Sequence, residues 1–377
     1  MSNTIYFVAG EASGDNHGAA LMRSLGELDD HFNFTGRGGP QMQMIAREKF
    51  KNWINDAAVL GLWEVIKKYG YFRKQFRETL NEIEESKADA VVLIDYPGFN
   101  LRLALALRRR SAKRKIIYYI SPQVWAWNRG RIKKMARFLD LMLCIFPFEA
   151  ELYNKSGLRT EFVGHPMVER LRARKIDIER DPNLIGLFPG SRRREVRKIF
   201  PILIETVGEL RKQRANLHFE VAAVSEALAN EISATLTAAQ VKDGLFRVVA
   251  DETAATMQRA SVGIIASGSA TLEAAYFRLP YVLIYKVAWP TYLAARLVVN
   301  VKYLGMANVL ANKEVVPEFI QHRARPNTIA KAALQLINDP VARDEMISEF
   351  DRIVAKLGEG GAGEKAARAI VEELGAT

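Results

Sequence analysis

The sequence predicts an α/β protein with two Rossmann-like domains. Short runs of β-branched and aromatic residues alternate with longer stretches of helical periodicity. This alternation is typical of right-handed βαβ crossovers and parallel sheets. A charged stretch at 168–183 separates two such series, and 377 residues suffice for two domains of ordinary size.

The expected strands follow from these runs. In the first half they are 4–9, 89–95, 115–121, 141–146 and 160–164, and in the second half 183–190, 217–224, 245–249, 261–267 and 280–285. The expected domains are 1–170 and 180–340, and 341–377 closes the chain with helices. Since ligands of open parallel sheets bind beyond the carboxyl ends of strands, residues after each run are the candidates for function.

Composition indicates a globular protein of a reducing compartment. Hydrophobic residues make up 49% and charged residues 26%, and the single cysteine, Cys144, excludes a disulfide framework. The chain starts directly with a strand, so we expect no signal peptide and a cytoplasmic protein. The longest apolar stretch, from Tyr281, is interrupted by Lys286, Pro290 and Arg296, which favours a strand and a helix over a membrane span.

The net charge of +11 implies an anionic partner. A nucleic acid, a phosphate-bearing substrate and an anionic membrane surface all satisfy it, and composition does not choose among them.

The first strand is followed by an acidic turn, "GEASGD", where a nucleotide-binding protein would hold a phosphate. Glu11 and Asp15 would repel a pyrophosphate there, and Gly10 and Gly14 do not complete a G-x-G-x-x-G motif. Two interpretations stay open. In the first, Ser13 or Asp15 caps the helix. In the second, the two carboxylates and the serine hydroxyl accept hydrogen bonds from sugar hydroxyls.

A second acid ends the strand in "VVLIDYPGFN". Asp95 precedes a Pro-Gly turn and Asn100. Partial burial at a strand end would raise the pKa of Asp95 toward neutrality, which suits a general base. The alternative is an Asp that organises the turn.

Two glycine turns in the second half suit a nucleoside diphosphate. "GLFPGSRRREV" places Gly190, Ser191 and Arg192 at a helix entrance, where amides, a hydroxyl and guanidinium groups favour an anion. "SVGIIASGSATLEAAY" supplies a second turn followed by Glu273, a carboxylate that can accept both hydroxyls of a ribose. The small residues of that turn are Ser267, Gly268, Ser269 and Thr271. The alternative for the arginines is a solvated basic cluster.

Two further segments combine aromatic and basic residues. "SPQVWAWNRGRIKKM", with Gln123 and Trp125, could line a sugar-binding or interdomain cleft or stack RNA bases, and we favour the cleft. The stretch from Val59 suits a helix on an anionic membrane or, alternatively, a helix packed on its own core. Its apolar side comprises Leu62, Val65, Ile66, Tyr69 and Phe72, and its basic border Lys67, Lys68, Arg73 and Lys74.

No metal site is expected. The five histidines are dispersed without H-x-x-x-H spacing or a cysteine pair, and no P-loop is present. His165, in "FVGHPM", is the histidine expected beside an interdomain cleft, with a structural role as its alternative.

Taken together, these motifs resemble the lipid-A-disaccharide synthase family. They are "VAGEASGD", "IDYPGFN", "SPQVWAW", "FPFE", "FVGHPM", "PGSR" with "EV", "SGSATLE" and "ANVLA", in this order across nearly the whole chain. The resemblance implies a GT-B glycosyltransferase, two Rossmann-like domains facing each other across a cleft. It implies metal-independent, inverting transfer from UDP-2,3-diacylglucosamine to 2,3-diacylglucosamine 1-phosphate (lipid X) at the cytoplasmic face of the inner membrane, without a cofactor.

By the same resemblance, the second domain holds UDP, with Arg192 at the diphosphate, Glu273 at the ribose and Asn308 lining the site. Asp95 becomes the leading base, with Glu11, Asp15 and His165 behind it. Some relatives have Asp where this chain has Gly98, so that second carboxylate is absent here. The C-terminal helices could pack back on the first domain or be exchanged in a homodimer.

Two alternative functions remain. A UDP-sugar epimerase on the same scaffold would need no second substrate. An RNA-binding protein would account for the charge and the tryptophan-rich segment, but it would leave "PGSR" and "SGSATLE" unexplained.

Overall fold

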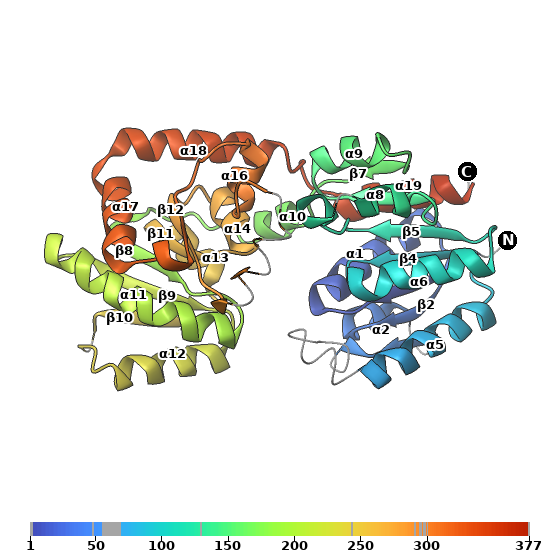
Figure 1. Cartoon of the computed structure of the whole chain (residues 1–377), viewed down its shortest axis with the longest axis horizontal. Helices are drawn as coiled ribbons and strands as arrows, with labels where there is room; N and C mark the ends of the chain where they lie inside the picture. The colour runs from blue at the N-terminus through green and yellow to red at the C-terminus, as the bar shows by residue number, and fades with distance from the viewer. Residues whose placement is uncertain are drawn as a thin grey trace. The chain divides into compact units, whose positions relative to one another are not determined.

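The computed structural model describes residues 3–46, 49–54, 69–128, 130–242, 244–289, 292, 293, 296, 299 and 301–375. The chain forms two compact units. Unit 1 comprises residues 1–166 and 357–377, and unit 2 comprises 167–356. Each unit is built around one parallel sheet (Figure 1), so the predicted pair of Rossmann-like domains is confirmed.

Unit 1 has a seven-stranded sheet in the order β3-β2-β1-β4-β5-β6-β7, parallel in every described pair. Its strands are β1 Thr4–Ala9, β2 Asn33–Gly38, β3 Phe50–Asn52, β4 Ala90–Ile94, β5 Lys115–Tyr119, β6 Leu141–Cys144 and β7 Thr160–Phe162. Its helices are α1 Ala12–Leu28, α2 Pro40–Ala46, α5 Tyr69–Glu85, α6 Pro97–Arg110, α7 Val124–Trp127, α8 Gly130–Met135, α9 Pro147–Asn154 and α19 Ala362–Leu374.

Unit 2 has a six-stranded sheet in the order β10-β9-β8-β11-β12-β13, again parallel in its described pairs. Its strands are β8 Asp181–Phe188, β9 His218–Ala223, β10 Phe246–Ala250, β11 Ala260–Ala266, β12 Tyr281–Tyr285 and β13 Glu318–Ile320. Its helices are α10 Met167–Arg172, α11 Arg193–Gln213, α12 Glu226–Ala238, α13 Thr253–Arg259, α14 Ala270–Tyr276, α16 Met306–Ala311, α17 Pro326–Asn338 and α18 Pro340–Ala355, with a 3-10 turn at Gln321–Arg323.

The two faces of the unit 1 sheet bury separate cores, because side chains alternate along each strand. Phe7 of β1 belongs to the core that includes residues of α1 and α19, whereas Val8 belongs to the core that includes residues of α5 and α6. Both side chains are fully buried. Burial on both faces explains why these strands read as continuous apolar runs in the sequence.

Strand β2 escaped the sequence analysis, as did β3 and β13. Glycines 36 and 38 lower its β-propensity, yet Gly36 is required: with φ of 142°, an added Cβ would lie 2.1 Å from the Phe7 carbonyl oxygen. Between them, Arg37 is fully buried and donates from Nε to Glu82 Oε2 at 2.6 Å. This ion pair joins β2 to α5.

The C-terminal helices divide between the units. Helix α18 belongs to unit 2, where Phe350 is buried and stacks on Tyr281 with ring centroids 5.5 Å apart. The chain therefore returns to unit 1 after Lys356, later than the expected boundary at 341. Helix α19 then packs on its own unit 1, burying Ala366 and Ile370. No helix in the described ranges is long and apolar enough to cross a membrane.

Shortening a buried side chain of α19 should lower the free energy of unfolding of unit 1. Ile370 is fully buried in the core beside α1, so Ile370→Ala removes apolar contacts and leaves a cavity. We expect a loss of about 2–5 kcal/mol in the free energy of unfolding, measured by denaturant titration. Lys365→Ala, an exposed change on the same helix, should cost little. Equal stability of both variants would contradict this packing.

Candidate functional site

The turn after β4 holds Asp95 in a strained backbone conformation. Asp95 and Tyr96 have φ values of 45° and 51°, which non-glycine residues rarely adopt. The Asp95 carbonyl oxygen accepts hydrogen bonds from Asn100 Nδ2 at 2.8 Å and from the Tyr118 hydroxyl at 2.5 Å. Such outliers persist where surrounding contacts hold them and cluster at functional sites.

Burial sets the electrostatics of this turn. Loss of solvation, followed by the negative charge of Glu11, raises the pKa of Asp95 to about 6. Glu11 is exposed at the start of α1, and its side chain makes no capping bond. The structure therefore brings Glu11 close enough to Asp95 to affect its charge.

Asn100 plays a structural part and does not line an open cleft. It is fully buried, and its Nδ2 also donates to the Ile94 carbonyl oxygen at 3.1 Å. The amide thus holds the end of β4 and the turn that follows. Tyr118 escaped the sequence analysis because its place in the interior of β5 looked like core.

Asp15 is also committed to the backbone. Its buried carboxylate accepts N–H bonds from Gly39 at 3.0 Å, Gln41 at 2.9 Å and Met42 at 3.0 Å. It therefore caps α2, a role that is not among those expected for it. A Cβ on Gly39 would lie 2.6 Å from the Asp15 carboxylate, so the glycine admits this contact.

The other two residues expected in the acidic turn differ in exposure. Ser13 is exposed in the first turn of α1, where a ligand can reach it. Gly14 is buried, and a Cβ there would meet Ile94 at 3.7 Å.

Trp125 is buried beside an acid that the sequence analysis did not select. Its Nε1 donates to Glu149 Oε1 at 2.8 Å, and its ring meets Phe148 edge-on at 4.9 Å between centroids. Glu149 is fully buried in α9, and loss of solvation raises its pKa to about 7. The signal for it was the first of the two acids in "IFPFEAELY", which directly follows an apolar run. Gln123, expected beside Trp125, is exposed at the start of α7.

His165 lies just before the chain leaves unit 1, next to Leu357, where the chain returns to this unit. Its backbone N–H donates to the Leu357 carbonyl oxygen at 2.8 Å, and its ring centroid lies 5.3 Å from that of Phe146. Both contacts fit the structural alternative for this histidine.

Unit 2 contains a cavity of about 470 Å³ at the carboxyl ends of its strands. It is formed by the turn after β8, the turn after β11 and helix α10. Gly190 and Ser191 come from the first turn, and Glu273 follows the second. The lining residues are Arg170, Arg174, Phe188, Gly190, Ser191, Glu195, Ala222, Val224, Asp251, Thr253, Ala266, Ser267, Gly268, Ser269, Ala270 and Glu273.

Arg192 stands at the rim of this arrangement and is not part of the lining. Its side chain is 64% exposed at the start of α11, and Nη1 lies 3.4 Å from Glu195 Oε1. Gly190 has φ of 115°, and an added Cβ would lie 2.8 Å from Glu195 Oε2. Glycine at this position therefore keeps the turn open.

The second turn differs from the expectation in two respects. Thr271 is buried, and its hydroxyl donates to the Gly268 carbonyl oxygen at 2.7 Å, so it closes the turn. Glu273 is paired with Arg170, whose Nη2 lies 2.8 Å from Oε1. The sequence analysis missed Arg170 in α10 and Arg174 just after it, because this segment follows no strand of unit 2.

Asn308 does not line this cavity. It is fully buried, and Nδ2 donates to the Val316 carbonyl oxygen and to Glu318, while Oδ1 accepts from the N–H groups of Val315 and Val316. All four hydrogen-bonding positions of the amide are occupied, so Asn308 fixes the loop before β13.

The predicted membrane-facing segment lies largely outside the described residues, which omit Leu62, Val65, Ile66, Lys67 and Lys68 and the side chain of Tyr69. At the start of α5, Phe72 packs against the core of unit 1. Arg73 and Lys74 are exposed, and Lys74 lies 3.8 Å from Glu78.

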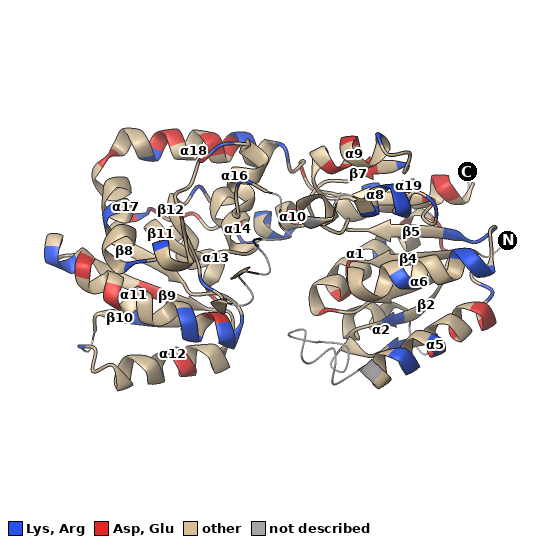
Figure 2. Cartoon of the chain, viewed as in Figure 1, with Lys and Arg blue, Asp and Glu red and all other residues tan. Residues whose placement is uncertain are grey.

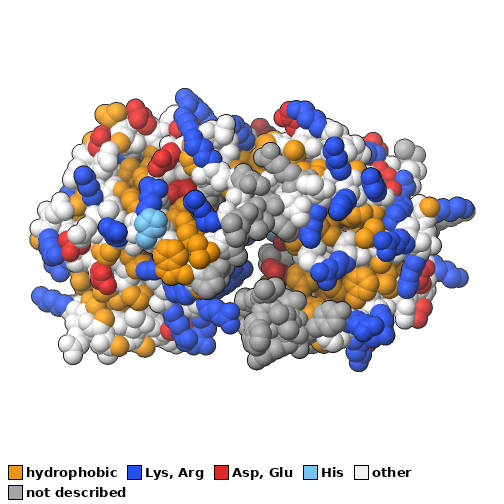
Figure 3. Space-filling model, viewed as in Figure 1, with side chains coloured by type: hydrophobic (Ala, Val, Ile, Leu, Met, Phe, Trp, Pro, Cys, Tyr) orange, Lys and Arg blue, Asp and Glu red, His pale blue; other side chains and the backbone are white. Residues whose placement is uncertain are grey.

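Basic residues are distributed over both units. Figure 2 shows them on helices of each unit, including α8, α10 and α11. On the face drawn in Figure 3, Lys and Arg side chains are scattered and alternate with apolar and acidic groups. The described side chains on this face form no continuous basic track of the kind that RNA-binding surfaces use.

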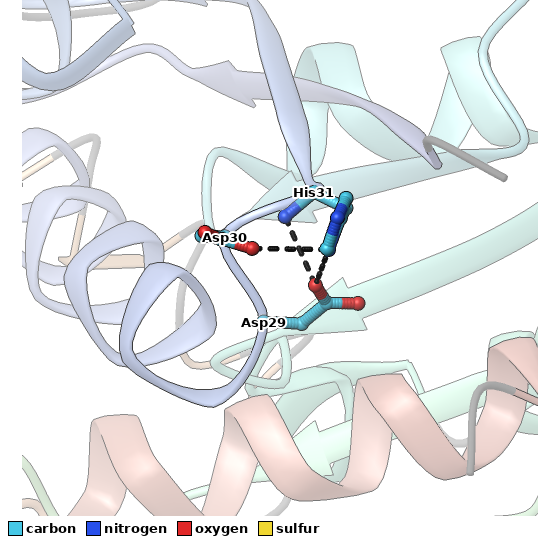
Figure 4. A group of neighbouring side chains, drawn as sticks. All are labelled: Asp29, Asp30 and His31. Carbon is cyan, nitrogen blue, oxygen red and sulfur yellow. Dashed lines mark hydrogen bonds and ion pairs between the residues drawn. The ribbon is translucent and has the colours of Figure 1, made fainter.

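Among the described residues, one group has the spacing of metal ligands. Asp29, Asp30 and His31 meet in the turn between α1 and β2 (Figure 4). His31 Nδ1 lies 2.8 Å from Asp29 and 3.0 Å from Asp30. The hydrogen bond to Asp29 raises the pKa of His31, which favours the protonated ring over a metal ligand.

The fold defines the class of this protein. A UDP-GlcNAc 2-epimerase from Neisseria meningitidis, in a structure bound to UDP-GlcNAc, is similar with a TM-score of 0.62 at 12% identity, covering 98% of this chain and 99% of that one. CalG4, the calicheamicin glycosyltransferase, gives 0.58 at 13% identity, covering 99% and 98%. Both likenesses concern the fold, which is the GT-B fold of glycosyltransferases and UDP-sugar epimerases.

Sequence comparison then identifies the family. A family profile described as lipid-A-disaccharide synthetase matches residues 5–368. Lipid-A-disaccharide synthase from Geobacter sulfurreducens is 36% identical, covering 99% of this chain and 98% of that protein. Lipid-A-disaccharide synthase 1 from Legionella pneumophila (strain Philadelphia 1) is 34% identical, covering 94% of each. The chain belongs to the lipid-A-disaccharide synthase family of glycosyltransferases.

The buried Glu149 should make stability depend on pH. Because its pKa is raised from 4.5 to about 7, the folded state holds the proton more tightly than the unfolded chain. Its contribution is therefore full below pH 4.5 and is lost as pH rises toward 7. Glu149→Gln keeps an acceptor for Trp125 but cannot ionise.

As pH increases from 5 to 8, the Tm of Glu149→Gln should increase relative to that of the wild type. We expect about 2–4 °C for each kcal/mol by which the variant becomes more stable than the wild type. Thermal unfolding across this range measures it. Glu151→Gln, an exposed change on the same helix with Lys155 as its partner, should show no such rise. If the Tm values of Glu149→Gln and wild type changed with pH in parallel, the raised pKa of Glu149 would be disproved.

Proposed function

We propose that this chain is an inverting, metal-independent glycosyltransferase that joins UDP-2,3-diacylglucosamine to 2,3-diacylglucosamine 1-phosphate. The products are the β-1,6-linked disaccharide 1-phosphate and UDP. The observation that carries the proposal is the unit 2 cavity, formed by two glycine-containing turns and an acid just beyond them, in a chain of the lipid-A-disaccharide synthase family.

The donor's UDP would occupy this cavity. Gly190 and Ser191 open the entrance to α11, where backbone N–H groups and the helix dipole favour a diphosphate. Arg192, exposed at that entrance, can turn from Glu195 to a phosphate oxygen. These groups would stabilise the negative charge that develops on the leaving UDP.

Asp95 is the proposed base in unit 1. A pKa of about 6 leaves it ionised at neutral pH while keeping it basic enough to take the proton from the acceptor's 6-hydroxyl. The oxygen then attacks C1 of the donor sugar from the side opposite UDP, which inverts the anomeric centre. Glu11 supports this role by raising the pKa of Asp95, and the commitment of Asp15 to α2 makes Asp15 a poor base.

We further propose that the protein binds the cytoplasmic face of the inner membrane through the segment 59–76 and takes both acylated sugars there. Exposed Arg73 and Lys74 would attract anionic headgroups. A homodimer that exchanges C-terminal segments remains a prediction, as does the absence of a nucleic-acid partner.

The second candidate is epimerisation of a UDP-sugar, because a fold neighbour is a UDP-GlcNAc 2-epimerase bound to UDP-GlcNAc. The two functions differ in stoichiometry. Transfer releases UDP only when an acceptor is present, whereas epimerisation acts on the donor alone.

The deciding experiment measures UDP release from UDP-2,3-diacylglucosamine in mixed micelles, with and without lipid X. Transfer predicts release that requires lipid X and matches the disaccharide formed. Conversion of the donor sugar without lipid X would favour the epimerase, and the absence of both reactions would refute the proposal.

Removing the charge of Asp95 should slow transfer without unfolding the protein. Asp95→Asn keeps the size of the side chain but accepts no proton, so we expect kcat to fall about 10²-fold or more. UDP affinity should stay near wild type, and Tm at neutral pH should not fall, because burial disfavours the charge that Asn removes. In the wild type, kcat should decline as pH falls through about 6, because protonation removes the base.

Asp89→Asn serves as the control, since Asp89 is exposed before the amino end of β4 and bonds the N–H of Thr4 at 2.8 Å. It should leave turnover nearly unchanged. Near-normal turnover of Asp95→Asn would move the base to Glu11 or His165.

A further inference from the structure

The carboxylate of Glu273 sits in a costly position. The residue is 9% exposed in the first turn of α14, and it lines the unit 2 cavity. A buried carboxylate without a cationic partner is expensive, and it tends to take up a proton. A protonated acid would lose one of the acceptor sites that a sugar diol needs.

Arg170 is the cationic partner of Glu273. Its Nη2 lies 2.8 Å from Glu273 Oε1, and its side chain is half-exposed in the same cavity. A charge-assisted bond of this length limits the rotation of the carboxylate. Among the described residues, no hydrogen bond is recorded for Oε2, so this oxygen can still accept one.

We propose that Arg170 is a positioning residue for nucleotide selection: it orients the Glu273 carboxylate so that this group accepts hydrogen bonds from a ribose diol. This inference rests on the proposed function, because it takes the cavity to hold UDP. It differs from that proposal in assigning the specificity for ribose to a pair of residues, of which one comes from α10.

The position of Arg170 supports a role separate from phosphate binding. Glu273 follows the β11 turn, whereas the proposed phosphate entrance follows β8 at Gly190 and Ser191. Arg170 already uses one N–H group on Glu273. Replacing it should therefore disturb recognition of the sugar hydroxyls while leaving recognition of the second phosphate intact.

The test is calorimetric binding of UDP, 2′-deoxy-UDP and UMP to the full chain. We define ribose discrimination as the Kd for 2′-deoxy-UDP divided by the Kd for UDP. For the wild type it should be roughly 10-fold or more, the worth of a hydrogen bond to a charged acceptor. Glu273→Gln should bring it close to 1.

Arg170→Gln should also bring ribose discrimination close to 1, while the ratio of the UMP and UDP dissociation constants stays as in wild type. Arg170→Lys keeps the charge but loses the planar donor, and should give an intermediate value. Because the two residues act as a unit, the double variant should give the same ribose discrimination as Glu273→Gln alone. Arg172→Gln removes the same charge from the same helix outside the cavity lining, and should leave both ratios unchanged.

Two results would overturn the inference. One is full ribose discrimination in Arg170→Gln with a collapsed UMP to UDP ratio, which would make Arg170 a phosphate ligand. The other is unchanged discrimination in Glu273→Gln. Failure of the wild type to bind UDP would instead refute the proposed function itself. Tm values of all variants establish that they are folded, and Arg170→Lys carries the test if Arg170→Gln is not.

Discussion

The parallel pairing of both sheets is the constraint on which the rest of the structure depends. Every described strand pair is parallel, so the chain must cross back along a helix before each new strand. The carboxyl ends of each sheet consequently lie along one edge. In unit 1 this geometry places the turn with Asp95 at that edge, and in unit 2 it places the turns after β8 and β11 there, which makes these turns functional candidates.

The backbone N–H and C=O groups of the turns at this edge lose contact with water and therefore need hydrogen-bond partners. Buried polar side chains provide these partners. Asp15 accepts three N–H bonds from the start of α2, and Asn100 donates to the carbonyl groups at the end of β4. These residues shape the sites without facing a ligand.

Burial also divides the acids by role. Loss of solvation raises the pKa values of Asp95 and Glu149, and the negative charge of Glu11 adds to the shift of Asp95. Glu273 and Glu82 are each paired with an arginine, from α10 and β2 respectively. A buried acid with a raised pKa at a strand end is suited to proton transfer, whereas an acid bound to an arginine is held in place to accept hydrogen bonds. The same residue type thus serves two purposes according to its neighbour.

The sequence by itself determined the parallel strands at the centre of each sheet and the turns that carry Asp95, Gly190 and Glu273. Continuous apolar runs and glycine turns are local signals, and the order of the motifs identified the family. The tertiary structure alone decided which polar residues face inward. Strand β2 forms despite its glycines because its neighbours and the Arg37–Glu82 pair hold it, Asp15 caps a helix 25 residues away, and Arg170 reaches Glu273 across 103 positions. Such partners are set by packing between distant segments, which local sequence patterns do not encode.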